Sequence, residues 1–277
     1  MLPHSYSGLK RSTLCLSLAL VTLVLSGCDS RLVAMFQALK QPASVEHLKV
    51  KIVSARPHDT AAFTEGLVWD NGELFESVGQ YGLSHLREVD PQSGKIVQQV
   101  DLPPQVFGEG LALVNGRLIQ LTWREHTAYE YDEKTLANEA YVSYSGEGWG
   151  LCYDGTALYM SDGSPTIQER DPLTFSVTQD IPVTLEGQPV NNVNELECVD
   201  GSIYANVWHT YNILRIDKLT GVVTAVIDAS GLLTPSETTQ AGSEGVLNGI
   251  AYDSQHHTFL ITGKLWPHLF EVTFVPG

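Results

Sequence analysis

The sequence contains few of the residues, and none of the spacings, on which common metal and nucleophile sites depend. Cysteine occurs only four times in 277 residues, and neither a Cys-x-x-Cys nor a His-x-x-x-His pair is present. The usual zinc-binding motifs are therefore excluded. The Gly-x-Ser-x-Gly sequence of serine hydrolases is also missing, which excludes the strained turn that exposes their nucleophile. We therefore predict no metal site from the spacing of these residues.

Basic residues are also scarce. The chain has 16 Lys and Arg residues against 32 Asp and Glu residues, which gives a formal net charge of −16. A surface so acidic repels phosphate backbones and anionic lipid headgroups. Nucleic acid and a charged membrane surface are therefore not expected as partners. With 43% hydrophobic residues, the chain can still build a substantial core.

The one long apolar run lies at the N-terminus. Lys10 and Arg11 precede an apolar stretch at residues 14–25, which is shorter than the roughly 20 residues that span a membrane. The sequence Leu25-Ser26-Gly27-Cys28 follows it. A basic start, an apolar core and Leu-x-Gly-Cys together resemble a bacterial lipobox.

This arrangement predicts three segments. Residues 1–27 are a lipoprotein-type signal peptide cleaved before Cys28, whose thiol carries the lipid; residues 28–48 are a tether; and residues 49–277 are the folded domain. The protein is then expected to be exported to the bacterial cell envelope, facing the periplasm and held to the membrane by its lipid alone. An ordinary signal peptide or a single membrane anchor is the alternative.

The rest of the chain is organised by a short repeated pattern, a turn that leads into an apolar strand and ends at Leu or Ile. Its five copies are Phe63-Thr64-Glu65-Gly66-Leu67, Phe107-Gly108-Glu109-Gly110-Leu111, Glu147-Gly148-Trp149-Gly150-Leu151, Asn192-Val193-Asn194-Glu195-Leu196 and Val246-Leu247-Asn248-Gly249-Ile250. The aligned Leu and Ile positions are 44, 40, 45 and 54 residues apart. Such a period, filled with short strands, is typical of a propeller.

Four strands are predicted in each repeat. Turns such as Asn71-Gly72 and Asn115-Gly116 favour hairpins, because both central residues of these turns need positive φ. Third strands end in an acidic residue in four of the repeats, and fourth strands follow them. The second strands are predicted at Glu73–Val78, Arg117–Thr122, Ala157–Ser161, Ser202–Val207 and Thr258–Thr262.

The first and last repeats complement each other. Residues Lys49–Ala55 form one strand too many before the first repeat, whereas the fifth repeat ends one strand short. We therefore predict an all-β, five-bladed β-propeller whose last blade is closed by this N-terminal strand, because closure removes exposed sheet edges. The polar insertion Gly231–Glu244 is predicted to be a loop over one mouth of the channel.

Two cysteines remain outside the N-terminal segment. Cys152 and Cys198 fall on the predicted first strands of adjacent repeats. An oxidising compartment permits a disulfide between them. Two buried thiols are the preferred interpretation.

The residue just before the Gly or Glu of each repeat is predicted to lie at one mouth of the channel. These aligned residues are Glu65, Glu109, Trp149, Asn194 and Asn248. A second ring is predicted at the ends of the second strands, and it includes Gln80, Tyr81, Trp123, Asp162, Trp208, His209, Lys264 and Trp266. Carboxylates beside converging indoles indicate an aromatic pocket for a small ligand. Turn residues whose side chains only satisfy backbone groups are the alternative.

In combination, these motifs are similar to those of the plant and bacterial type of glutaminyl-peptide cyclotransferase. The resemblance runs from about Val50 to Phe274. It rests on the repeat motifs above and on Leu121-Thr122-Trp123, Asn206-Val207-Trp208 and Thr262-Gly263-Lys264-Leu265-Trp266. It implies a five-bladed propeller that converts N-terminal glutamine of peptides to pyroglutamate with loss of ammonia. It leaves open whether a structural calcium or other divalent ion lies in the channel.

The resemblance also implies roles for individual residues. Glu109 matches the catalytic glutamate of the family. Asn194 and Lys264 are expected to assist it, whereas Glu65 stands where the family often has Gln. The residues predicted to form the substrate-binding pocket are Glu65, Phe107, Trp123, Trp149, Trp208, Gln80 and Asn248. The reaction requires no cofactor, and we expect a monomer.

Two other functions fit the sequence. A calcium-dependent propeller lactonase or esterase would use Glu65, Glu109, Asn194 and Asn248 as oxygen ligands. A propeller that only binds peptides would need no catalytic group, and fold alone does not separate these possibilities. A buried carboxyl group beside three indoles favours the cyclotransferase.

Overall fold

Each of the first three repeats forms its own four-stranded antiparallel sheet in the computed structural model, which describes residues 44–277. The sheets are β2 (Thr64–Asp70), β3 (Glu73–Val78), β4 (His85–Val89) and β5 (Ile96–Asp101); β6 (Gly108–Val114), β7 (Arg117–Thr122), β8 (Thr127–Asp132) and β9 (Asn138–Ser143); and β10 (Leu151–Tyr153), β11 (Leu158–Met160), β12 (Thr166–Arg170) and β13 (Val177–Pro182). The predicted signal peptide, Cys28 and residues 28–43 of the predicted tether lie outside the described residues. No helix among residues 44–277 is long and apolar enough to cross a membrane.

The last two repeats share one sheet of eight strands. Its order is β16-β17-β18-β19-β1-β22-β21-β20. The bounds are β1 (Glu46–Pro57), β16 (Val193–Val199), β17 (Ser202–Val207), β18 (Asn212–Asp217), β19 (Val223–Asp228), β20 (Leu247–Asp253), β21 (Thr258–Gly263) and β22 (His268–Pro276). Between β13 and β16 lies a small hairpin of β14 (Thr184–Leu185) and β15 (Gln188–Pro189).

The N-terminal strand occupies the predicted place beside the last strand of the chain. β1 (Glu46–Pro57) includes the predicted Lys49–Ala55 and pairs antiparallel with β22. Its first residues also pair in parallel with β19, which joins the fourth and fifth repeats into the one sheet. Both edges that would otherwise be exposed are thereby covered.

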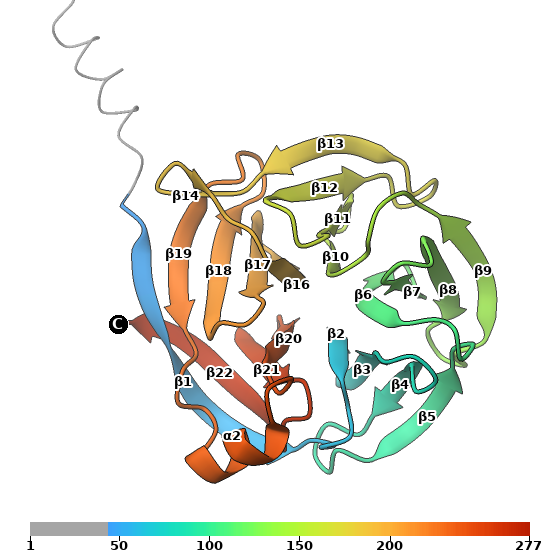
Figure 1. Ribbon diagram of the computed structural model, residues 1–277, viewed down its shortest axis with the longest axis horizontal. Coiled ribbons are helices and arrows are strands. Elements are labelled where there is room, and N and C mark those ends of the chain that lie inside the picture. Colours follow the sequence, from blue (N-terminus) through green and yellow to red (C-terminus); the bar gives the residue numbers. More distant parts are fainter. Residues whose placement is uncertain (1–43) are drawn as a thin grey trace, which may run out of the picture. The chain divides into compact units, whose positions relative to one another are not determined.

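The first strands of the five repeats gather around one axis. β2 contacts β6 and β20, and β10 contacts β6 and β16, which in turn contacts β20. Figure 1 shows these five strands innermost, with β5, β9, β13 and β1 at the periphery. The pattern is that of a propeller-like fold, with the five inner strands around a common axis.

Polar residues of the repeats form the turns, as their types predict. Asn71, Asn115 and Asp200 have φ near +50°, and a glycine with positive φ follows each of them. The acidic residues that end the third strands accept hydrogen bonds from the backbone N–H three residues later, as Asp90 does from Ser93 at 2.7 Å. Asp132, Asp171 and Asp217 repeat this bond with Thr135, Thr174 and Thr220. These carboxylates therefore serve turn geometry.

The two cysteines outside the N-terminal segment are bonded to each other, so the preferred interpretation of two buried thiols was wrong. Cys152 and Cys198 form a disulfide with their Cα atoms 5.5 Å apart. They lie on β10 and β16, which are neighbours around the axis although 46 residues separate them in sequence. A cross-link that closes a loop of this length typically contributes about 2–4 kcal/mol to stability.

The polar insertion also differs from its prediction as a loop. It contains α2 (Pro235–Ala241), which begins at a capping box of Thr234 and Glu237, with Pro235 in the first turn. The Thr-Pro-x-Glu pattern was a readable start signal for a helix. Ala241 packs with Trp266 and Phe270, which holds the insertion against the last sheet.

Candidate active site

β-Bulges place the polar residues of the repeats at the mouth of the channel. The register of the innermost hairpin shifts between Thr64 and Gly66 in the first repeat, and the same shift occurs at the aligned positions of the second, fourth and fifth. A bulge leaves one residue unpaired and re-aims its side chain. The residues at these bulges include Glu65, Glu109, Asn194 and Asn248.

The glycines of the repeats allow the inner strands to approach one another. A Cβ atom at Gly66 would lie 2.6 Å from the Leu111 nitrogen, and one at Gly110 would lie 2.5 Å from the Trp149 oxygen. The fourth repeat has Glu195 at this position. Its buried carboxylate accepts the backbone N–H groups of Leu67 at 3.2 Å and Ile250 at 2.8 Å, and so joins three inner strands.

Three of these bulge residues, Glu65, Glu109 and Asn194, meet the aromatic residues in one cavity of about 230 Å³. Eight of the ten predicted site residues line it: Glu65, Phe107, Glu109, Trp123, Trp149, Asn194, Trp208 and Lys264. Phe63 and Glu244 also line it and were missed. Phe63 could have been found, because Phe63-x-Glu65 repeats the spacing of Phe107-x-Glu109. Glu244 lies in the irregular insertion, where no repeat pattern places it.

The other two predicted residues lie outside the cavity lining. Asn248 is fully buried behind Glu65, and its Nδ2 donates to the Thr64 carbonyl oxygen at 2.9 Å and to Glu65 Oε2 at 3.1 Å. Gln80 has a φ of 92°, and its carbonyl oxygen accepts the backbone N–H of Leu83 at 3.0 Å. Gln80 is thus a turn residue, whereas Asn248, whose side chain bonds a backbone carbonyl oxygen, matches the alternative interpretation. Of the second predicted ring, only Trp123, Trp208 and Lys264 line the cavity.

A buried ion pair forms part of the cavity floor. Lys264 Nζ lies 2.6 Å from Glu65 Oε1, and both side chains are at most 7% exposed. The same ammonium group lies 4.4 Å from the centroid of the Phe63 ring. Burial raises the pKa of Glu65, and the charge of Lys264 opposes that rise. With Lys264 and Asn248 bonded to it, the Glu65 carboxylate is held in one position.

Of the carboxyl groups of Glu65 and Glu109, that of Glu109 has the more strongly raised pKa. Burial raises the pKa of Glu109 well above its usual range, and the negative charge of Glu65 raises it further, against a smaller opposite effect of Lys264. Two neighbouring carboxyl groups do not both ionise readily in an apolar cavity. At neutral pH, Glu109 is therefore suited to take and return a proton.

Asn194 carries an unused hydrogen-bonding atom in the cavity. The residue is 3% exposed, and within residues 44–277 its Oδ1 has no hydrogen-bond partner. A buried carbonyl oxygen without a donor is unfavourable, typically by about 1–3 kcal/mol. A ligand that supplies an N–H group at this point would remove that deficit.

Aromatic rings form the walls of the cavity. Trp149 and Trp208 meet edge to face with centroids 5.5 Å apart, and Phe107 meets Trp123 at 5.6 Å. Two glycines make room for them. A Cβ atom at Gly79 would lie 2.5 Å from the Phe107 ring, and one at Gly163 would lie 2.6 Å from Trp149.

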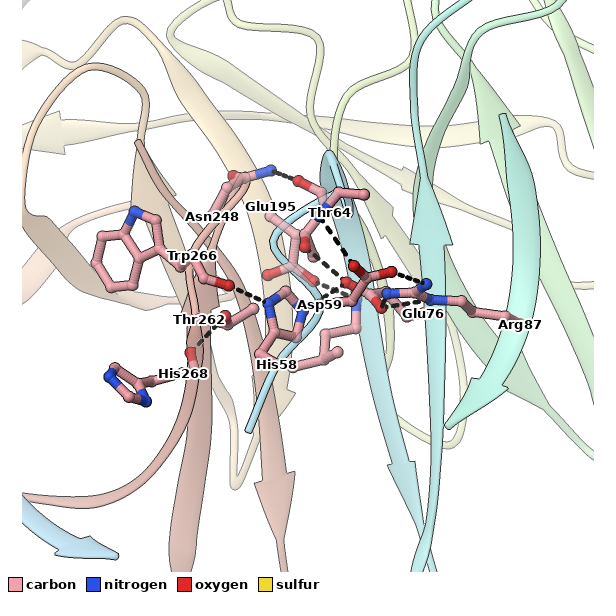
Figure 2. A network of polar contacts seen from close by, with 12 residues as sticks. His58, Asp59, Thr64, Glu76, Arg87, Glu195, Asn248, Thr262, Trp266 and His268 are labelled. Atoms are coloured by element: carbon pink, nitrogen blue, oxygen red, sulfur yellow. Dashed lines mark hydrogen bonds and ion pairs between the residues drawn. The ribbon is translucent and has the colours of Figure 1, made fainter. Parts of the chain in front are cut away.

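A polar network supports the first inner strand from behind. Glu76 on β3 accepts the hydroxyl of Thr64 at 2.6 Å, His58 Nε2 lies 2.9 Å from the same carboxylate, and Arg87 Nε donates to it at 2.8 Å. Figure 2 shows this network beside the bond between Asn248 and Thr64. The strand that carries Glu65 is therefore held on two sides.

No group of three or more His, Cys, Asp or Glu side chains within residues 44–277 is placed to hold a metal ion. Glu65, which the lactonase interpretation would use as an oxygen ligand, already contacts the ammonium group of Lys264.

Comparisons with known proteins agree on one family. The sequence model of the family described as glutamine cyclotransferase matches residues 21–274. A glutaminyl-peptide cyclotransferase of Arabidopsis thaliana is 39% identical over 232 residues, which are 81% of this chain and 71% of the plant protein. The crystal structure of Myxococcus xanthus glutaminyl cyclase matches with a TM-score of 0.78 and 40% identity, over 84% of this chain and 100% of that one.

Proposed function

The chain belongs to the glutamine cyclotransferase family, and from this premise we propose that its cavity converts the N-terminal glutamine of peptides to pyroglutamate with release of ammonia. The observation that supports this proposal most directly is the buried Glu109 carboxyl group, whose pKa is raised, in an aromatic cavity of about 230 Å³. This cavity suits one flat, uncharged side chain. Glu109 lies in this cavity and can carry the proton that the reaction of such a side chain must transfer.

The reaction is an acyl transfer within one residue. The α-amine nitrogen of the substrate attacks its own γ-carboxamide carbon, the new C–N bond closes a five-membered ring, and the amide nitrogen leaves as ammonia. Glu109 accepts the proton that the attacking amine loses and then gives it to the leaving nitrogen. No covalent intermediate with the enzyme forms, so the catalytic work is to orient the two groups and to move this proton.

Lys264 and Asn194 would complete the site. The Lys264 ammonium group bonds Glu65 at 2.6 Å and has further N–H donors for the oxyanion that develops on the γ-carbonyl oxygen. The buried Asn194 Oδ1 would accept an N–H of the substrate amide or amine. Phe107, Trp123, Trp149 and Trp208 would exclude water and hold the side chain curled. Asn248 would act through Glu65, which it positions.

We also infer that the five groups of strands are the blades of a five-bladed propeller. The four-strand repeats, the contacts among β2, β6, β10, β16 and β20, and the pairing of β1 with β22 support this count. The catalytic cavity would then lie at the mouth where the inner strands begin.

The test of the proposed function is an ammonia-release assay with purified protein and a peptide that begins with Gln. We expect stoichiometric ammonia and pyroglutamate, with no loss of rate after treatment with a chelator, because the site holds its carboxylates with Lys264 and Asn248. A peptide that begins with Asn is the control, since it would form a strained four-membered ring. Loss of activity with chelator and recovery with calcium would favour the lactonase interpretation, and no turnover of the Gln peptide would refute the proposal.

We further propose that the protein is a monomer exported and anchored by lipid at Cys28, facing the periplasm. The Leu25-Ser26-Gly27-Cys28 sequence supports the export and the lipid anchor, and the Cys152–Cys198 disulfide supports the export, because such bonds persist in oxidising compartments. Replacing Cys28 by Ala should move the protein from the membrane fraction of cells to the soluble fraction. Unchanged membrane association of that variant would contradict the lipid anchor.

A further inference from the structure

Glu147 connects two walls of the cavity from outside it. Its Oε2 accepts the indole N–H of Trp123 at 2.8 Å and that of Trp149 at 3.2 Å. The two tryptophans come from different sheets, since Trp123 follows β7 and Trp149 precedes β10. Glu147 itself is not among the residues that line the cavity. One carboxylate oxygen thus fixes the orientation of two rings.

The second oxygen of this carboxylate is also occupied. Arg124 Nε donates to Glu147 Oε1 at 2.9 Å, and the Arg124 guanidinium lies 3.7 Å from the centroid of the Trp123 ring. Burial alone would raise the pKa of Glu147, but the hydrogen bonds from Trp149, Arg124 and Trp123 outweigh it and leave the pKa below its usual value. The group is therefore a carboxylate, the stronger acceptor, at neutral pH.

The backbone beside Glu147 is tied to the same tryptophan. The N–H of Gly148 donates to the Trp123 carbonyl oxygen at 3.0 Å, and a side chain at Gly148 would collide with the Thr122 carbonyl oxygen. On the other side, the Gly146 carbonyl oxygen lies 2.7 Å from His126 Nδ1. The carboxylate is therefore presented to both indoles by a segment whose backbone is hydrogen-bonded on both sides of Glu147.

We propose that Glu147 is a positioning residue for the cyclisation site, acting through Trp123 and Trp149. By accepting both indole N–H groups on the outer side, it orients the two rings and leaves neither Trp123 nor Trp149 with a free indole donor to compete for the substrate amide. This inference rests on the proposed function. It assigns Glu147 to substrate binding and not to proton transfer.

Replacing Glu147 by Gln keeps the size of the side chain but removes the charged acceptor and puts an NH₂ group in place of one oxygen. The expected result is a rise in KM for Gln peptides of about tenfold with a smaller change in kcat, because a bond from an indole N–H to a charged group is lost while Glu109 is untouched. Glu139→Gln, an equal charge change on the exposed edge strand β9, is the matched control and should leave both constants unchanged.

A double-mutant cycle separates positioning from a general structural effect. Phe lacks the indole N–H, so Glu147→Gln should have little further effect in a protein that already carries Trp123→Phe and Trp149→Phe. Thermal unfolding and near-ultraviolet circular dichroism, measured without substrate, report whether the variants are folded and whether the tryptophan environment changes.

The outcomes are distinguishable. If the wild-type protein does not cyclise Gln peptides, the proposed function fails. If it does, the inference about Glu147 is overturned by an unchanged KM in Glu147→Gln, or by an equal fold-change with and without the two indole donors. A raised KM that disappears in the Phe background, together with an altered near-ultraviolet signal, supports it.

Discussion

Replacing Glu109 by Gln is expected to lower kcat for a Gln-initiated peptide by about 10²–10⁴-fold, the usual contribution of one general acid–base group. Gln fills the same volume and can still hydrogen-bond, but it cannot take a proton from the attacking amine. The raised pKa of the Glu109 carboxyl group makes it a better match to neutral conditions than an exposed glutamate. KM should change much less than kcat, because the cavity walls remain.

The measurement is steady-state ammonia release, with circular dichroism as the test of folding. Turnover within a few-fold of the wild type in a folded variant would remove Glu109 from the mechanism.

A second variant, Glu65→Gln, tests whether the charge of Glu65 raises the pKa of Glu109. Without the charge of Glu65, the pKa of Glu109 falls, so the acid limb of the pH profile of kcat/KM should move to lower pH. A limb that stays in place would show that Glu65 does not influence the titrating group.

Replacing Glu76 by Gln is expected to reduce the free energy of unfolding by about 3–5 kcal/mol, the usual effect of breaking a buried ion pair from one side. Glu76 and Arg87 are paired directly across β3 and β4, and both are 1% exposed. Removing the carboxylate leaves the His58 side chain without its counter-ion and leaves Arg87 with only the partly exposed Asp59, 2.8 Å away. It also removes an acceptor from Thr64, next to Glu65 (Figure 2).

The stabilisation by this network should decrease both when the pH is lowered and when it is raised. Burial would raise the pKa of Glu76, but the charges of His58 and Arg87 hold it far below its usual value of 4.5, so its contribution is present above that value and is lost as pH falls through the folded pKa. Burial would lower the pKa of His58, but the charge of Glu76 raises it above 6.5, so its contribution is lost as pH rises through that higher pKa. The variant should therefore differ most from the wild type between these two limits.

Urea unfolding at several pH values measures both effects. Glu88→Gln is the control, since Glu88 is only half-buried on the neighbouring strand and accepts a hydrogen bond from Gln98. Its expected effect is within about 0.5 kcal/mol. A loss below about 1 kcal/mol for Glu76→Gln would show that the buried network contributes no more than an exposed ion pair.

Much of the strand order was readable because it depends on local rules. Glu73–Val78, Arg117–Thr122 and Ser202–Val207 have the same bounds in the prediction and in the structure. Their ends are set by turn residues such as Asn71-Gly72, which bend the chain wherever they occur. The alignment of repeats then placed Glu65, Glu109, Trp149 and Asn194 together, because residues at equivalent positions of successive repeats lie at the same mouth of the channel.

The errors arose where a side chain depends on a partner that no repeat specifies. Gln80 and Asn248 were assigned to the pocket by alignment, but one is held in a turn and the other behind Glu65. Cys152 and Cys198 lie within reach of each other only because β10 and β16 are adjacent around the axis. Glu147 was read only as the first residue of a repeat, yet its two indole donors come from different sheets.

The sequence by itself determined the repeating strands, the turns between them and the family, since these depend on residue type and spacing along the chain. The tertiary structure decided which side chains face the cavity, which stand behind them and how their charges interact. The physical reason is that the pKa of Glu109, the orientation of the indoles and the disulfide depend on distances of a few ångströms between residues far apart in sequence. Only the closing of β1 onto β22, with the inner strands gathered around one axis, sets those distances.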